Sequence, residues 1–171
     1  MRRRILTLIA AAAIGTTVVA APLPVRIVST SPSITESLFA LGLGARVVGV
    51  SNHCRYPDDV VTLHRVGTYL RPDTEVIARL RPDLVLLSAG PHQAERQLTS
   101  LGLHAITLEP GSLNSIYSTI HAIGDAAGVG ARAGTLVAEI RTALDRVHRT
   151  AAGRPPNRTW SGRASAPTIG S

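Results

Sequence analysis

The stretch Arg26–Leu41, which reads RIVSTSPSITESLFAL, decides the fold of this chain. Its β-branched residues Ile27 and Val28 fit a short buried strand, and the polar turn Ser31–Ser33 follows them. Beyond the turn, three apolar residues recur at helical spacing: Ile34, Leu38 and Leu41. A strand that feeds a helix through a tight polar turn is typical of an α/β sheet, so we predict that architecture.

The serines of this turn have two possible roles. Ser33 and Glu36 have the spacing of a capping box, which predicts that Ser33 caps the helix. Backbone N–H groups at the carboxyl end of a strand also bind ligands in open α/β sheets. The second hypothesis is therefore a binding crevice beside Ser31, Pro32 and Ser33.

Charge and composition argue against nucleic acid as a partner. The 171-residue chain has a net charge of +7, but three of its 18 basic residues lie at Arg2–Arg4, and without them the net charge is +4. Aromatic residues make up only 3% of the chain, which is too few for base-stacking surfaces. We expect no nucleic-acid binding.

The amino terminus has the pattern of an export signal. Arg2–Arg4 form a charged region, Ile5–Ile14 an apolar one, and Val18–Ala20 supplies small or medium residues before a cleavage point. We predict a cleavable signal peptide over residues 1–20, with an uncleaved anchor as the alternative. No cysteine lies there to carry a lipid, which predicts a protein free in the periplasm.

Cys54 is the only cysteine, so no internal disulfide can form. A metal or haem-iron role for His53, Cys54 and His64 is an alternative, although neighbouring residues chelate one ion awkwardly. We expect Cys54 to be a small packed side chain and predict no metal site.

The remaining chain alternates between strand and helix patterns. Predicted strands lie at residues 46–50, 66–69, 84–87 and 105–108, and predicted helices at 74–80, 93–101 and 116–123, the last closed by Gly124 or Gly128. From Gly130 to Ala152 one apolar face continues for about 30 Å at 1.5 Å per residue, which predicts a long helix. Residues 153–171 lack periodicity, and we predict that they are disordered.

Three motifs together resemble the amino-terminal lobe of the substrate-binding proteins that serve ABC importers of cobalamin, haem and iron–siderophores. The first is Ser31-Pro32-Ser33-Ile34-Thr35-Glu36 with Leu41-Gly42-Leu43-Gly44 after it, the second is Cys54-Arg55-Tyr56-Pro57 followed by Val66-Gly67, and the third is Leu80-Arg81-Pro82-Asp83-Leu84-Val85-Leu86. The second motif is most similar to the cobalamin-binding branch.

The resemblance implies a Rossmann-like parallel-sheet lobe over residues 21–128 and a bridging helix over 129–152, followed in the family by a second lobe. Here only the predicted tail follows, so we expect the second lobe to be missing and the ligand cleft to have one wall. Such a cleft buries less of a ligand, which predicts weakened binding.

The resemblance also implies roles for individual residues. Tyr56 and Tyr69 are expected to face the ligand, where an aromatic ring stacks on a corrin or porphyrin; the alternative is that Tyr56 packs its own loop. Ser88 and Gly90 follow a buried strand in the same region and complete the expected ligand site. Glu95 is expected to dock on the importer permease, and the alternative is a solvated helix surface.

A further candidate from the residues themselves is Arg71, which is expected either to meet an anionic group or to stay solvated.

The resemblance implies that the ligand is cobalamin, haem or a ferric siderophore. No cofactor is expected, and we expect a monomer without enzymatic activity. The alternatives are an exported α/β enzyme of the hydrolase kind and a non-functional fragment. No nucleophile elbow or zinc-protease motif supports the enzyme.

Overall fold

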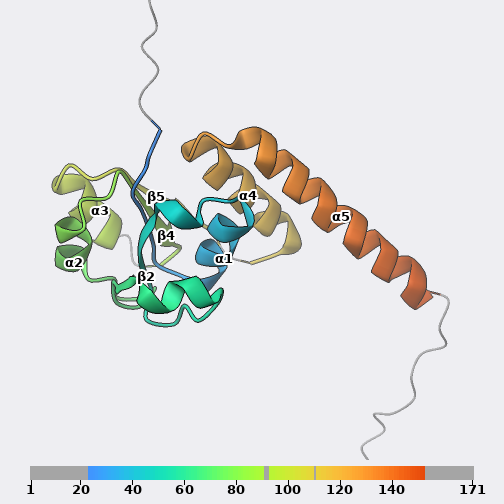
Figure 1. The fold of residues 1–171 in the computed structure, drawn as a ribbon, viewed down its shortest axis with the longest axis horizontal. Helices are drawn as coiled ribbons and strands as arrows, with labels where there is room; N and C mark the ends of the chain where they lie inside the picture. The colour runs from blue at the N-terminus through green and yellow to red at the C-terminus, as the bar shows by residue number, and fades with distance from the viewer. Residues whose placement is uncertain (1–22, 91–92, 110, 153–171) are drawn as a thin grey trace, which may run out of the picture.

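The computed structural model describes residues 23–90, 93–109 and 111–152. Within them a five-stranded parallel sheet lies between two layers of helices (Figure 1). The strands are β1 (Ile27–Ser29), β2 (Val47–Val50), β3 (His64–Arg65), β4 (Leu84–Ser88) and β5 (Ala105–Leu108). The α-helices are α1 (Pro32–Ala40), α2 (Thr74–Arg79), α3 (Gln93–Ser100), α4 (Leu113–Ala126) and α5 (Gly130–Ala152), and the 3₁₀ helices are η1 (Gly44–Arg46) and η2 (Asp58–Thr62).

The centre of the sheet is formed by β1 and β4. The strand order is β3-β2-β1-β4-β5, and Ile27 of β1 pairs with Val47 of β2 on one side and Leu84 of β4 on the other. Four successive residues of β4, Leu84–Leu87, are buried, as expected for a strand covered on both faces. The chain runs outward from β1 to β2 and in the opposite direction from β4 to β5, so the β1–β4 boundary is a topological switch point.

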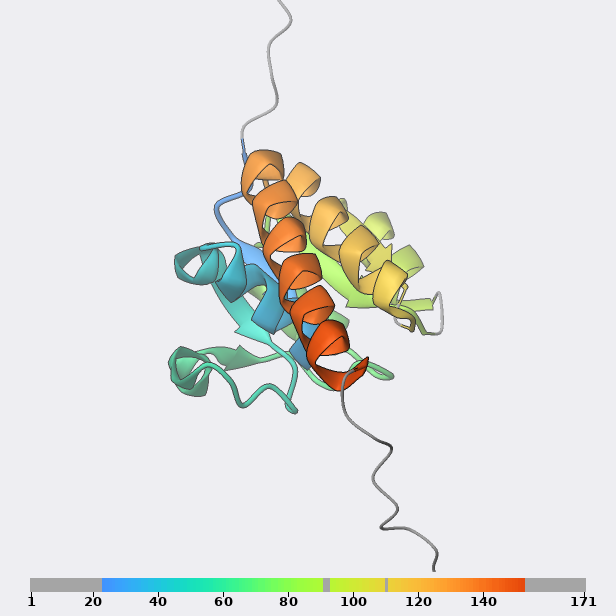
Figure 2. The same ribbon diagram turned by 90° about the vertical axis from the view of Figure 1, so that its right-hand side faces the viewer.

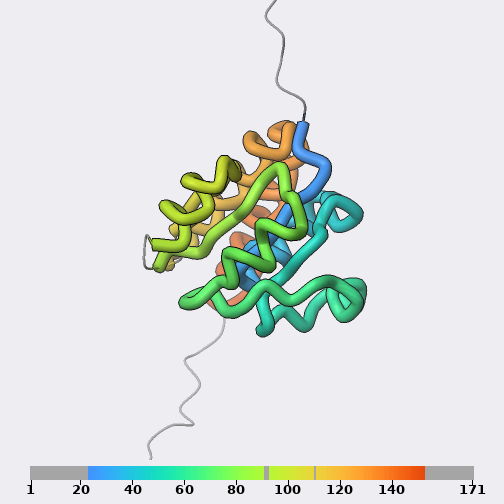
Figure 3. Tube along the Cα trace, turned by 90° about the vertical axis from the view of Figure 1, so that its left-hand side faces the viewer, coloured from blue at the N-terminus to red at the C-terminus, as the bar shows by residue number. Residues whose placement is uncertain are grey.

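Each face of the sheet has its own apolar cluster. The larger cluster lies under α1, α4 and α5, and the smaller one under α2 and α3. Figure 2 shows α4 and α5 in front of the sheet, and Figure 3 shows α2 and α3 on the opposite side. Leu86 belongs to the first cluster and Val85 to the second, because successive side chains of a strand point to opposite faces.

Helix α5 packs on α4 through its first half and then extends beyond the sheet (Figure 1). Ala133 and Val137 are buried, whereas Val147 is 60% exposed. Arg141 lies over the ring of Tyr117 at 4.7 Å from its centroid, which attaches the helix to α4 close to where it leaves the lobe. In the described part of the chain, no helix combines the length and the apolar character that crossing a membrane requires.

The predicted parallel α/β fold is confirmed, and the predicted helix from Gly130 to Ala152 is present as α5. The third strand was placed wrongly: it lies at His64–Arg65 instead of residues 66–69, where Gly67 pairs with Pro72 in a tight turn. This edge strand is short and exposed, so it carries no apolar pattern. The predicted signal peptide and the predicted tail lie outside the described residues.

Candidate functional site

Polar residues gather where β1 ends and α1 begins. Pro32 is the first residue of α1, and Ser31 is its N-cap, whose Oγ accepts the N–H of Ile34 at 3.5 Å. The predicted capping box is therefore wrong, because Ser33 lies inside the first turn and is exposed. The hydroxyls of Ser31 and Ser33 are 3.3 Å apart; Ser31 is buried, and Ser33 is exposed at this edge.

A buried hydrogen-bond network lies beneath this turn. The Thr35 hydroxyl donates to Ser29 Oγ at 2.8 Å and lies 3.2 Å from Cys54 Sγ, and the Ser29 hydroxyl donates to the Ser31 carbonyl at 3.1 Å. Cys54 is 1% exposed, as expected for a packed side chain. Because buried polar groups that are fully paired rigidify their surroundings, this network fixes the Ser31 turn and the Cys54 loop relative to each other.

A second group of site residues lines one small pocket. Tyr69, Ser88, Gly90 and Glu95 line this small pocket, together with Thr107 of β5. The Thr107 hydroxyl donates to Glu95 Oε2 at 2.8 Å, so the carboxylate is anchored across the α3–β5 contact. The structure thus brings Glu95, for which the resemblance implied permease docking, beside three residues of the expected ligand site. Glu95 is half-buried, in contrast to the exposed carboxylate that the sequence suggested.

Tyr69 is presented by a tight turn. The N–H of Thr68 donates to the Arg71 carbonyl at 3.1 Å, and the N–H of Arg71 donates back to the Thr68 carbonyl at 3.2 Å. Gly67 precedes this pair at φ +89°, and a Cβ there would lie 2.6 Å from the Arg71 carbonyl oxygen. Glycine is therefore required for the turn, which leaves the ring of Tyr69 44% exposed beside the pocket.

The two groups of residues belong to one edge of the sheet. The N–H of Ser88, at the end of β4, donates to Thr30 Oγ1 at 3.1 Å, and Thr30 directly follows β1. This contact lies across the β1–β4 switch point, where open α/β sheets bind their ligands. The Ser31 turn and the Tyr69 pocket therefore flank the position that the topology favours for a ligand.

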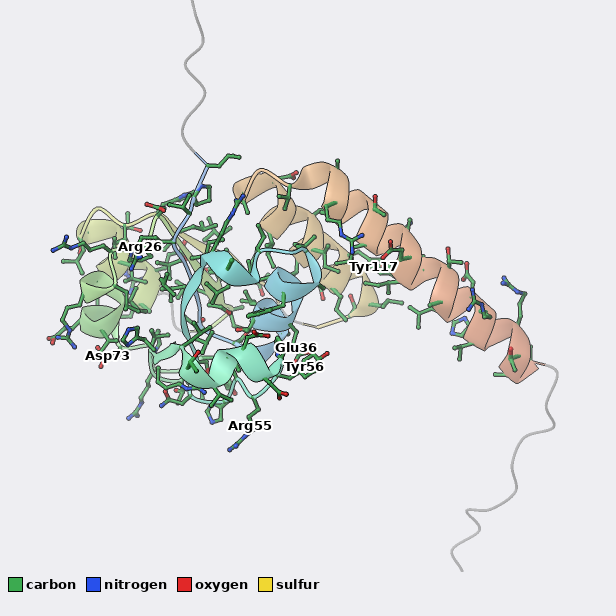
Figure 4. The ribbon with its side chains drawn as sticks, viewed as in Figure 1. Arg26, Glu36, Arg55, Tyr56, Asp73 and Tyr117 are labelled. Carbon is green, nitrogen blue, oxygen red and sulfur yellow. The ribbon has the colours of Figure 1, made fainter. Side chains whose placement is uncertain are left out.

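Tyr56 lies further along the same edge, in the loop after β2. It is 68% exposed, and Figure 4 shows it with Arg55 at the lower edge of the molecule. A ring this exposed is not packed into its own loop, so its face is available to a ligand.

Sequence reasoning missed a neighbouring open hollow that is lined by Asn52, Cys54, Arg55, Val61 and Arg65. Two arginines before and after η2 were the signal that could have found it. Arg71, which the sequence singled out, lines another open hollow between the Tyr69 turn and α3. The metal alternative gains no support, because the described residues hold no group of three or more side chains able to bind an ion.

Comparison with known proteins decides the family. A family model described as periplasmic binding protein matches residues 27–164. The chain belongs to the periplasmic binding protein family. A relative from Bacillus subtilis (strain 168), named as an uncharacterized ABC transporter substrate-binding lipoprotein, is 35% identical over 133 residues, which are 75% of this chain and 42% of the relative.

Two further similarities name ligands for those proteins. The vitamin B12-binding protein of Yersinia pestis (strain Pestoides F) is 35% identical over 97 residues, which are 56% of this chain and 35% of that protein. A solved periplasmic haem-binding protein from Pseudomonas aeruginosa superposes with a TM-score of 0.72 and 31% identity, over 76% of this chain and 48% of that one. The chain therefore spans about half, or less, of the length of these family members.

Proposed function

We propose that this chain forms one wall of the ligand cleft in the substrate-binding component of an ABC importer, and that the ligand is a cobalamin-like molecule or an iron chelate. The proposal rests on the arrangement of residues at the β1–β4 switch point. There the hydrogen bond between Thr30 and Ser88 joins the Ser31 turn to the Tyr69 pocket. Membership of the family supports the binding role, since its relatives are named as binding proteins.

The ligand would lie across the ends of β1 and β4. The rings of Tyr56 and Tyr69 supply exposed aromatic surface for a flat macrocycle, while the hydroxyls of Ser31 and Ser33 supply hydrogen bonds. Ser88 and Gly90 shape the space next to Tyr69 without filling it. No resident cofactor enters this proposal; the chelate is the cargo.

Glu95 is the proposed contact with the importer permease. Its Oε2 accepts the Thr107 hydroxyl, which leaves Oε1 to accept hydrogen bonds from arginines of a partner. A carboxylate fixed in one direction loses less rotamer freedom on docking than a free one, which favours this role. The proposed location is the periplasm, with export directed by the amino-terminal segment, and the proposed state is a monomer.

Ligand binding is better supported than catalysis as the role of this site. Among the described residues, the hydroxyl of Ser31 contacts the Ser33 hydroxyl and the Ile34 N–H, and no histidine lies within hydrogen-bond reach to activate it. A generic ester hydrolysis assay tests the rival role: turnover that disappears in Ser31→Ala or Ser88→Ala would assign an enzyme instead.

The direct test is an absorbance titration of the purified chain with cobalamin, haem and a ferric siderophore. We expect one of them to saturate the chain, and Tyr69→Ala to weaken that binding by about tenfold while Tyr69→Phe retains it, because the ring face makes the contact. Since the chain spans 48% of the haem-binding structure, the same titration is made with the chain joined to the remaining half of that relative. Failure of all three ligands with both proteins would refute the proposal.

A further inference from the structure

The hollow beside Tyr56 has an unusual lining of positive charge. Arg55 and Arg65 both line it, together with Asn52, the buried Cys54 and Val61. It lies at the carboxyl end of β2 and β3, on the same edge of the sheet as the ligand site, because the residues after parallel strands meet at one edge.

Arg65 is fixed in place by the backbone of the loop that it faces. Its Nη1 donates to the carbonyls of Ser51 at 3.1 Å and Cys54 at 2.9 Å, and both of these residues are buried. A guanidinium has five N–H donors, and these two bonds use only those of Nη1. In the described part of the chain, the donors of Nε and Nη2 contact no acceptor, so one side of the fork stays free for a ligand.

Arg55 adds a second cation that no carboxylate neutralises. Among the described residues, the ion pairs join Arg79 to Glu75 and Arg132 to Glu139, and none involves Arg55 or Arg65. The nearest acids in sequence, Asp58 and Asp59, begin η2 and lie beyond 4 Å of either guanidinium. Two unpaired guanidinium groups on one hollow create a local positive potential that attracts an anion.

We infer that the Arg55–Arg65 hollow binds a carboxylate group of the ligand, with the fork of Arg65 as the donor held by the backbone and the exposed Arg55 as a second donor. This inference rests on the proposed function, since Tyr56 is the neighbour of Arg55 and would hold the flat part of the same ligand. Arginine suits a carboxylate because two parallel N–H donors match its two oxygens. The hollow therefore selects a chelate that carries peripheral carboxylates, such as a porphyrin with propionate groups, over cobalamin, whose side chains are mainly neutral amides.

The first arm of the test examines the anion site without any chelate. Citrate is titrated into ¹⁵N-labelled chain at low ionic strength, and the arginine Nε–H resonances are followed. The variants Arg55→Gln and Arg65→Lys identify the resonances of the two arginines, and we expect citrate to shift both resonances in a saturable way. We expect Arg55→Gln to lower the affinity for citrate by about three- to tenfold, a modest loss because exposed charge pairs are screened. Arg79→Gln removes one positive charge elsewhere and should leave the affinity unchanged.

The second arm asks whether the ligand uses this site. Iron protoporphyrin with free carboxylates is compared with its dimethyl ester, which has the same ring and no charge. We expect the free acid to bind more tightly, and Arg55→Gln to reduce that difference by about three- to tenfold without weakening the ester, because Arg65 remains as a donor. Arg55 is exposed, and neither ion pair among the described residues involves it, so its replacement should leave the loop folded, and circular dichroism checks this.

The two arms separate the two hypotheses. A citrate titration without saturable shifts at these arginines overturns the anion site, as does equal affinity for acid and ester. If citrate binds at Arg55 and Arg65 but cobalamin, haem and siderophore all fail to bind, the anion site stands and the proposed transport function falls.

Discussion

At the scale of single residues, Ser31 has two tasks that its position makes compatible. Its hydroxyl accepts the Ile34 N–H and so satisfies one of the free donors at the start of α1. Its carbonyl receives the Ser29 hydroxyl from the buried network below. Pro32 favours this arrangement, because the first helical position needs no N–H donor and its fixed φ suits the helix.

Replacing Ser31 by Ala should lower the free energy of unfolding by about 1 kcal/mol, because α1 then starts with an unsatisfied N–H group. Ser33→Ala is the matched control: it removes an exposed hydroxyl inside the helix and should change stability by less than about 0.5 kcal/mol. Urea denaturation followed by circular dichroism measures both. If Ser33→Ala proved the more damaging change, the cap would lie at Ser33 after all.

Several site residues were predictable and several were not. Ser88, Gly90 and the Ser31 turn follow buried strands, and that pattern alone places them at the carboxyl edge of the sheet. Thr107 and Arg65 were missed because their roles depend on partners that only strand pairing and loop packing bring near: Glu95 for the first, and the carbonyls of Ser51 and Cys54 for the second.

At the scale of elements, the attachment of α5 depends on one close approach. Gly124 of α4 faces Ala133 of α5, and a Cβ at Gly124 would lie 2.5 Å from the Ala133 Cβ. Because Gly124 has no side chain, α4 and α5 can approach each other closely at this point. The Tyr117–Arg141 contact then holds α5 further along its length.

Gly124→Ala should destabilise the chain by about 1–3 kcal/mol, since the added methyl group forces α4 and α5 apart. Gly134→Ala makes the same change in α5 at a position where a Cβ meets nothing within 4 Å, and it should stabilise by about 0.5–1 kcal/mol because alanine favours a helix. Thermal and urea denaturation compare the two variants. Equal effects of the same sign would show that the glycine contact does not control the packing.

The elements that the sequence predicted best are those with a strong apolar pattern. Leu84–Leu87 could only be a strand buried on both faces, and the long face of α5 left no alternative to a helix. The strand β3 (His64–Arg65) was not predicted, because it is held by backbone pairing to β2 rather than by buried side chains. Polar edge strands have no apolar pattern by which the sequence could reveal them.

At the scale of the whole molecule, the two apolar clusters share the sheet between them. Val85 points into one cluster and Leu86 into the other, and both are fully buried. Neither cluster can lose its packing without disturbing the strands that support the other. The described lobe should therefore unfold as one cooperative unit.

Val85→Ala and Leu86→Ala should each lower the free energy of unfolding by about 2–4 kcal/mol through the cavities that they leave. Both should shift the same single transition when circular dichroism and hydrogen exchange follow it. Val147→Ala, on the exposed part of α5, should change stability by less than about 0.5 kcal/mol. Two separate transitions in either core variant would instead show that the faces of the sheet unfold independently.

The central position of β1 means that one of its pairing partners is synthesised much later than β1 itself. Its entry into the sheet is secured by Asp83, whose carboxylate accepts the N–H groups of Val25 and Arg26, 58 and 57 residues earlier in the chain. A ribosome that adds about 5–20 residues per second delivers that partner roughly 3–12 s after β1 itself. Until β4 is made, β1 has at most one of its two neighbouring strands, β2, so a nascent chain paused before β4 should expose the β4-facing edge of β1.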